Sequence, residues 1–182
     1  AHASSSPSSR WKTATGDADR GLDHGAWVPL LHLYPQADVP VFQVSLPMGL
    51  DAEGAWQYGR ALAPLADEGV LIVGSGSLTH NLYEVRFGDP QAEVYAGEFA
   101  AWVRAAVLAG DADRLRRTLE IAPHAHRAHP TTEHFLPLLV AAGAASQLEP
   151  ATVIEGGVLH GVLSMDSFMF CPDLAIEAPA HM

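Results

Sequence analysis

The segment from Val70 to Asn81, VLIVGSGSLTHN, constrains the fold more than any other part of the chain. Its apolar start is rich in β-branched residues, which is typical of a buried strand, and Gly74 and Gly76 interrupt it at the carboxyl end. In open α/β sheets, ligands bind in the crevice beyond the carboxyl ends of the strands. The segment therefore predicts a strand that delivers the residues after the glycines to such a crevice.

Three polar residues, Thr79, His80 and Asn81, follow the glycines. A histidine at this place can bind a metal, act as a general base or donate a hydrogen bond to a substrate. An ordinary polar loop between a strand and a helix fits the local pattern equally well. A phosphate-binding loop fits poorly, because the third glycine of the dinucleotide fingerprint is missing and no Gly-Lys-Ser/Thr follows. No Gly-x-Ser-x-Gly elbow is present either, which weakens a serine-hydrolase interpretation.

Helical periodicity alternates with strand-like runs through most of the chain. Asp23, Asp51, Asp111 and Thr131 are the expected N-caps of helices. The expected helices cover about residues 24–33, 52–63, 95–109 and 112–121 and a segment after Thr131, and the expected strands cover 39–46, 70–73, 152–155 and 162–170. This alternation predicts an α/β fold, a three-layer sandwich with a mostly parallel central sheet flanked by helices.

Composition narrows the class of protein. The 182 residues suit one domain, and a net charge of −11 without a basic face argues against a nucleic-acid partner. A single cysteine, Cys171, fits a reducing compartment, and neither a membrane-length apolar stretch nor a signal peptide is visible, so the cytoplasm is expected. Residues 1–16 are predicted to be a disordered or non-native tail, 17–172 the folded domain, and 173–182 a flexible tail.

Ten histidines, as many as lysines and arginines together, raise the prospect of a metal or acid–base site. His134 is expected in the first turn of the helix capped by Thr131, where a rigid backbone suits a metal ligand. His124 and His126 form a His-x-His pair without a nearby carboxylate to complete a zinc cluster, which favours surface loop residues.

His24 precedes a glycine, which leaves its ring room to face a cavity, and Trp27 would line an aromatic pocket. A plain helix cap followed by core packing explains this segment slightly better on local grounds. The residues of this segment alone therefore do not decide between a substrate-binding role and a structural one.

Together these segments resemble the class III extradiol ring-cleaving dioxygenases of the 4,5-DOPA dioxygenase-like group. The resemblance covers roughly residues 17 to 170. It is carried by GLDHGAW (21–27), LYP (33–35), the stretch 69–81, HPTTEHFLPL (129–138) and GVLSM (161–165).

This resemblance implies a non-haem Fe(II) site, which zinc occupies in some isolated proteins, and a reaction that opens a catechol ring with O₂ beside its hydroxyls. It places His134 at a ligand position, His80 at the acid–base position and close enough to serve as a ligand, and His24 at a second catalytic position in contact with substrate. Trp27, Thr79 and Asn81 are then expected to line the substrate site. A facial set of three ligands leaves open positions for catechol and O₂.

The resemblance also implies two further ligand histidines, in His-Gly-Ser-Pro and Ala-His-Trp stretches, and neither stretch occurs in this sequence. The chain therefore looks like the C-terminal two-thirds of such an enzyme, with its first strands absent. The absent strands would leave a sheet edge exposed, through which the chain is expected to be able to form a homo-oligomer. Two alternatives remain: a metal-poor module that binds a ligand without chemistry, and a zinc hydrolase that uses His124 and His126.

Overall fold

Helices dominate the structure, a computed structural model that describes residues 16–17, 19–89 and 91–170. The helices are α1 (His24–Leu33), α2 (Ala52–Leu62), α3 (Pro64–Asp67), the 3₁₀ turn η2 (Leu82–Glu84), α4 (Val94–Leu108), α5 (Ala112–Arg116), α6 (Thr118–Ile121), α7 (Ala125–Ala128) and α8 (Leu136–Ala144). The strands are β1 (Ala151–Ile154), β2 (Val158–Leu159), β3 (Leu163–Ser164) and β4 (Ser167–Phe170). The predicted tails lie almost wholly outside the described residues.

Three of the predicted caps are confirmed. The carboxylates of Asp23, Asp51 and Asp111 each accept a backbone N–H bond from the residue three positions further on. The predicted helix over 112–121 is instead two short helices, α5 and α6, because the backbone leaves helical geometry at Arg117 with φ −95° and ψ 6°. None of the described helices is both long and apolar enough to span a lipid bilayer.

The described strands pair only in antiparallel fashion. β1 pairs with β4, with Ala151 opposite Phe170 and Ile154 opposite Ser167, and β2 pairs with β3. The two late strands are therefore confirmed in position, and the second of them is divided into β3 and β4. The α/β class is confirmed, but the described residues do not form the predicted three-layer, mostly parallel sheet.

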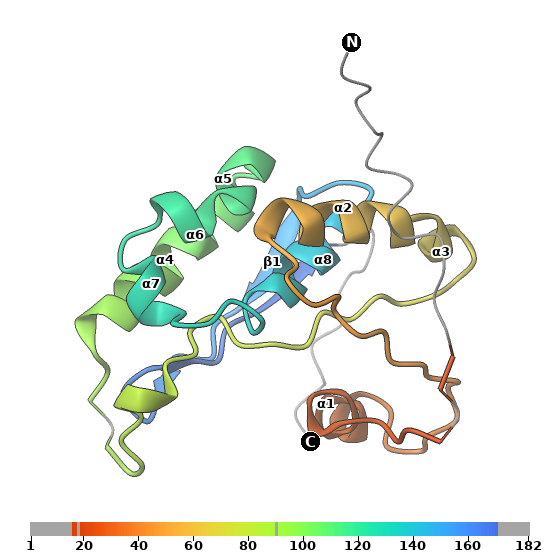
Figure 1. Ribbon diagram of the computed structural model, residues 1–182, viewed down its shortest axis with the longest axis horizontal. Helices are drawn as coiled ribbons and strands as arrows, with labels where there is room; N and C mark the ends of the chain where they lie inside the picture. The colour runs from red at the N-terminus through yellow and green to blue at the C-terminus, as the bar shows by residue number, and fades with distance from the viewer. Residues whose placement is uncertain (1–15, 18, 90, 171–182) are drawn as a thin grey trace, which may run out of the picture.

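The predicted strands over 39–46 and 70–73 are extended but unpaired. Within the described ranges, no backbone hydrogen bond joins either segment to a neighbouring strand. Their apolar side chains are correspondingly open to solvent, with Phe42 67% and Leu71 64% exposed. Figure 1 shows both segments running as open connections, the first rising from α1 to α2 and the second passing below α8. The expected strands are not formed because a strand needs a hydrogen-bonded neighbour.

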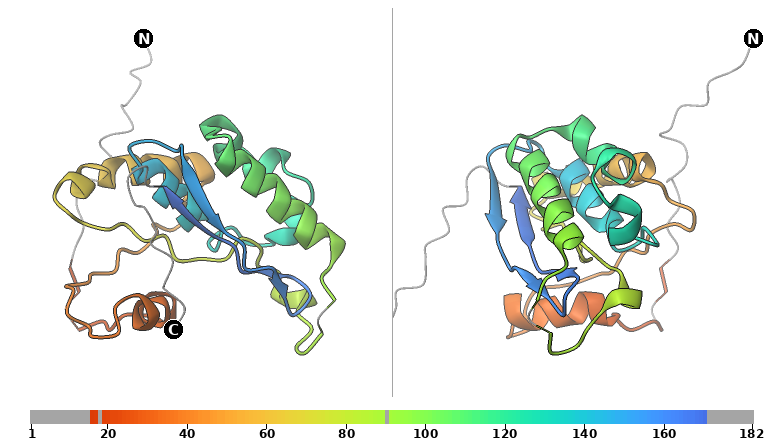
Figure 2. Two further views of the ribbon diagram at one scale, coloured as in Figure 1. Left: turned by 180° about the vertical axis from the view of Figure 1, so that it is seen from behind. Right: turned by 90° about the vertical axis from the view of Figure 1, so that its left-hand side faces the viewer.

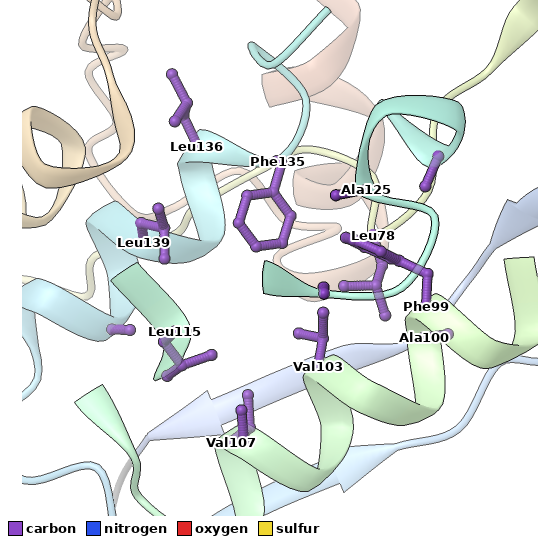
Figure 3. Close-up of a cluster of buried hydrophobic side chains, with 14 of the residues drawn as sticks. Leu78, Phe99, Ala100, Val103, Val107, Leu115, Ala125, Phe135, Leu136 and Leu139 are labelled. Atoms are coloured by element: carbon purple, nitrogen blue, oxygen red, sulfur yellow. The ribbon is translucent and has the colours of Figure 1, made fainter. Parts of the chain in front are cut away.

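The core is centred on α4. The hairpin strands lie along one side of this helix and α7 and α8 along the other, whereas α1 lies apart from the helical cluster (Figure 2). Phe99, Val103 and Val107 of α4 are fully buried; in Figure 3 Val107 faces Leu115, and Phe99 lies beside Leu78. The packing of these apolar side chains against α4 holds α7 and α8, and the segments next to them in the chain, in place.

Helices α2 and α8 approach each other through glycines. A Cβ atom on Gly59 of α2 would collide with the carbonyl oxygen of Val140, and one on Gly143 of α8 would collide with that of Trp56. The absence of side chains at both positions allows the two helix backbones to touch.

Candidate functional site

Two of the predicted site histidines lie face to face. The rings of His80 and His134 are stacked, with centroids 3.5 Å apart and an interplanar angle of 20°. His80 belongs to the loop after the extended 70–76 segment, and His134 to the turn before α8. The fold therefore brings together two imidazoles that are far apart in the sequence.

Backbone hydrogen bonds hold the two segments together on either side of the rings. The Ser77 N–H donates to the His134 carbonyl at 2.9 Å, and the His80 N–H donates to the Ala128 carbonyl at 2.8 Å. A Cβ atom on Gly76 would strike the His134 carbonyl oxygen. Gly76 is therefore required for the close approach of the two chains rather than for phosphate binding.

The other two polar residues of the loop face into the fold. The Thr79 hydroxyl donates to the Val162 carbonyl at 2.7 Å and accepts from the Ser164 N–H, also at 2.7 Å, and the residue is fully buried. The Asn81 amide donates to the Arg127 carbonyl at 2.8 Å. The polar atoms of both side chains thus hold the loop in place, and neither residue presents a free group to a substrate.

Replacement of Thr79 by valine is expected to destabilise the fold. Valine keeps the shape but leaves the Val162 carbonyl and the Ser164 N–H buried without their partner, which costs about 2 kcal/mol. Thr79→Ser retains the hydroxyl and is the matched control. Urea denaturation of the two variants measures the difference, and equal midpoints would show that the hydroxyl contributes nothing.

Burial and a neighbouring imidazole disfavour the protonated form of His80. Burial lowers the pKa of His80, and the neighbouring His134 lowers it further, while Glu133 opposes the shift. Only a neutral imidazole can offer a lone pair to a metal ion. The lowered pKa of His80 thus favours the form of this ring that can bind a metal ion.

His134 lies before α8 and not in its first turn, which corrects the prediction. The helix begins at Leu136, and its N-cap, Phe135, makes no side-chain cap bond. Thr131 does not cap a helix because its hydroxyl donates to the Glu133 carboxylate at 2.7 Å. The turn is closed instead by the Thr132 carbonyl, which accepts the backbone N–H groups of Phe135 and Leu136.

His24 and Trp27 lie on α1, and both are exposed. The Ser75 hydroxyl donates to the Gly25 carbonyl, which attaches the start of α1 to the extended segment that leads to His80. Within the described ranges, no ring contact or hydrogen bond joins His24 to the stacked pair. The predicted convergence of three histidines is therefore seen for two of them.

The stacked pair alone does not complete a metal site. Among the described residues there is no group of three or more His, Cys, Asp and Glu side chains that could hold a metal ion. His124 is bonded to Glu98 through Nε2 at 2.6 Å, and His126 is exposed on α7 rather than in a loop. His124 and His126 therefore belong to no such group in the described part of the chain.

A cleft of about 270 Å³ lies beside the turn that carries His134. Its lining residues are Leu46, Pro47, Met48, Gly49, Leu50, Thr132, Glu133 and Leu136. Neither ring of the stacked pair lines this cleft, so the cleft adjoins the candidate site without forming part of it.

One buried residue of the site, His129, was quoted in the family stretch but not predicted to have a role. Its side chain lies in the core, and burial lowers its pKa to about 4. The histidine precedes Pro130 in a short turn. Because such a turn has no helical or strand period, the sequence carries no signal of its burial.

Comparison with known proteins identifies the class of this fold and site. Residues 8–161 match the family described as the catalytic LigB subunit of aromatic ring-opening dioxygenase. The chain belongs to this family, and the resemblance predicted from its motifs is confirmed.

Several relatives carry the name 4,5-DOPA dioxygenase extradiol. The Beta vulgaris protein is 42% identical over 162 residues, which cover 89% of this chain and 60% of the relative. The Escherichia coli K12 protein is 36% identical over 148 residues, which cover 80% of this chain and 55% of the relative. The chain thus spans little more than half the length of these relatives.

A solved structure agrees with the fold. The crystal structure of the uncharacterized protein JW3007 from Escherichia coli K12 superposes with a TM-score of 0.72 at 37% identity. The superposition covers 82% of this chain and 62% of that chain.

Proposed function

We propose that this chain provides part of an extradiol dioxygenase that uses O₂ to open the ring of a catechol, of the type of DOPA, beside its hydroxyl groups. The observation that carries the proposal is the stacking of His80 on His134, whose ring centroids lie 3.5 Å apart, because it brings together the two imidazoles that are proposed to bind one ion. Family membership supports ring opening as the reaction class, and the names of the relatives support an extradiol enzyme.

The metal in the active form is proposed to be Fe(II), with Zn(II) as a competitor for the same imidazoles. The two imidazoles are proposed to take two positions of a facial ligand set, and the third donor is proposed to come from outside the described residues. His80 is proposed to move protons as well as to bind the metal. His24 and Trp27 are proposed to contact the substrate, because both are exposed on the helix that Ser75 attaches to the site.

The active form is proposed to contain a further strand. The extended segments 39–46 and 70–76 expose apolar side chains and unpaired backbone, which are the features of strands that lack a neighbour. The longer relatives have additional length to supply one. The alternative is that a second copy of this chain pairs with the same two extended segments.

The test joins this chain to the portion of the Beta vulgaris relative that lies outside the 162 matched residues. The chimaera is expected to bind Fe(II) stoichiometrically and to consume O₂ when a catechol is added, whereas the chain alone does so weakly. Isothermal titration calorimetry and an oxygen electrode measure the two properties. A folded chimaera that neither binds iron nor consumes O₂ with any catechol would refute the proposal.

In the same chimaera, His134→Ala and His80→Ala are each expected to reduce metal affinity by at least about 100-fold, because a lost ligand costs more than a lost outer-shell partner. His126→Ala is the matched control, since His126 is an exposed histidine of the neighbouring helix α7. Loss of bound zinc in the control, with retention in the other two variants, would favour a hydrolase centred on His124 and His126. Catechol binding unaffected by His80→Ala and His134→Ala would favour a metal-poor binding module.

A further inference from the structure

His129 joins the two segments that carry the stacked histidines. Its Nε2 atom lies 2.7 Å from the Leu78 carbonyl oxygen, and its side chain is 3% exposed. A carbonyl oxygen can only accept, so Nε2 must carry the proton. Nδ1 has no hydrogen-bond partner in the described part of the chain, as expected for the unprotonated nitrogen of this tautomer.

Two aromatic rings fix the orientation of this imidazole. The ring centroid of His129 lies 5.5 Å from that of Phe99 on α4 and 5.3 Å from that of Phe135, both at steep angles. Because both phenyl rings are fully buried, the imidazole has little freedom to rotate away from the Leu78 carbonyl.

The bond from His129 forms one half of a clamp on the loop that carries His80. The adjacent residue, Ala128, accepts the backbone N–H of His80 through its carbonyl at 2.8 Å. The residue pair 128–129 therefore grips the loop at two points, at Leu78 and at His80. The same turn continues five residues further to His134, so the clamp sets the distance between the two stacked rings.

We propose that His129 is a positioning residue, whose Nε2–H bond to the Leu78 carbonyl holds the His80 ring against the His134 ring. Its importance for ring opening rests on the proposed function, but the geometric role does not. It acts through the backbone of the neighbouring loop and touches neither substrate nor metal.

Two substitutions separate the hydrogen bond from simple packing. His129→Gln places an amide N–H near the position of Nε2 and keeps the donor. His129→Leu fills the core but leaves the Leu78 carbonyl buried without a partner. His126→Leu, at an exposed position of the same region, is the control.

The readout is the proton chemical shifts of the His80 and His134 rings, measured by NMR in protein with ¹³C-labelled histidine. Stacked rings shield each other, so wild type, His129→Gln and His126→Leu are expected to show upfield shifts. His129→Leu is expected to lose them. This readout needs no metal, so it can succeed even if the dioxygenase proposal fails. A folded His129→Leu protein that keeps the upfield shifts would overturn the inference.

A second measurement covers the case in which His129→Leu does not fold. The ¹⁵N shifts of His129 in the wild-type protein at neutral pH are expected to show a protonated Nε2 and an unprotonated Nδ1. The opposite tautomer would remove the donor and overturn the inference. In the active chimaera, metal affinity is expected to fall about 10- to 100-fold in His129→Leu and to recover in His129→Gln.

Discussion

Replacement of Gly59 by alanine is expected to destabilise the protein by at least about 2 kcal/mol. The new methyl group would meet the Val140 carbonyl oxygen of α8, and a backbone atom cannot swing aside as a side-chain end can. The strain of such overpacking, about 3 kcal/mol, exceeds the gain of up to about 1 kcal/mol from replacing glycine within a helix. Urea denaturation followed by circular dichroism measures the loss.

Gly97 provides the matched control for this prediction. It lies inside α4, and a Cβ atom there would meet nothing within 4 Å. Gly97→Ala is therefore expected to stabilise the protein by about 0.5–1 kcal/mol through helix propensity alone. Similar effects of the two substitutions would mean that α2 and α8 are not in backbone contact.

Acidification is expected to remove about 2 kcal/mol of stability between pH 6.5 and pH 5 through His129. Burial lowers the pKa of this residue to about 4 from its ordinary value of 6.5. The unfolded chain therefore takes up a proton at a higher pH than the folded chain does. The stabilising contribution is complete above pH 6.5, declines as the pH falls, and is exhausted near pH 4.

The charged neighbours of His129 act in both directions. His80 and His134 lower its pKa further, whereas Glu133 and the bond to the Leu78 carbonyl raise it. His80 adds to the effect on stability because its own pKa is lowered. The carboxylates whose pKa values are lowered titrate mainly below this interval, so pH 5 to 6.5 reports chiefly on histidines.

Denaturation of wild type and His129→Gln over this pH interval measures the contribution. The glutamine variant cannot take up the proton and is expected to lose about 2 kcal/mol less than wild type between pH 6.5 and pH 5. Parallel stability curves for the two proteins would show that another group causes the acid sensitivity.

The helices were predictable because their signals are local. An aspartate at the N-cap accepts a hydrogen bond from a backbone N–H only three residues away. The starts of α1, α2 and α5 could therefore be predicted from Asp23, Asp51 and Asp111 without tertiary information. Thr131 shows the limit of that logic, because the nearby Glu133 carboxylate takes its hydroxyl as a donor. The Thr131 hydroxyl could bond either to a backbone N–H of the helix or to the Glu133 carboxylate, and the residue types alone did not indicate which bond would form.

The two early strands, unlike the two late ones, were not confirmed, for a different reason. The β-branched runs at 39–46 and 70–73 are extended as expected, but a strand is defined by its partner, and no partner for either lies among the described residues. The exposed Phe42 and Leu71 are the physical mark of that missing contact.

The amino-acid sequence by itself determined the starts of α1, α2 and α5 and the membership of the ring-opening dioxygenase family, and it singled out His80 and His134 as candidates, because these depend on residues close together in the chain or on recognisable motifs. Only the tertiary structure decided that these two rings stack, that Thr79 is buried, and that His129 reaches Leu78 across 51 residues. These contacts join distant segments, and their geometry exists only once α4, α8 and the hairpins have packed around one core.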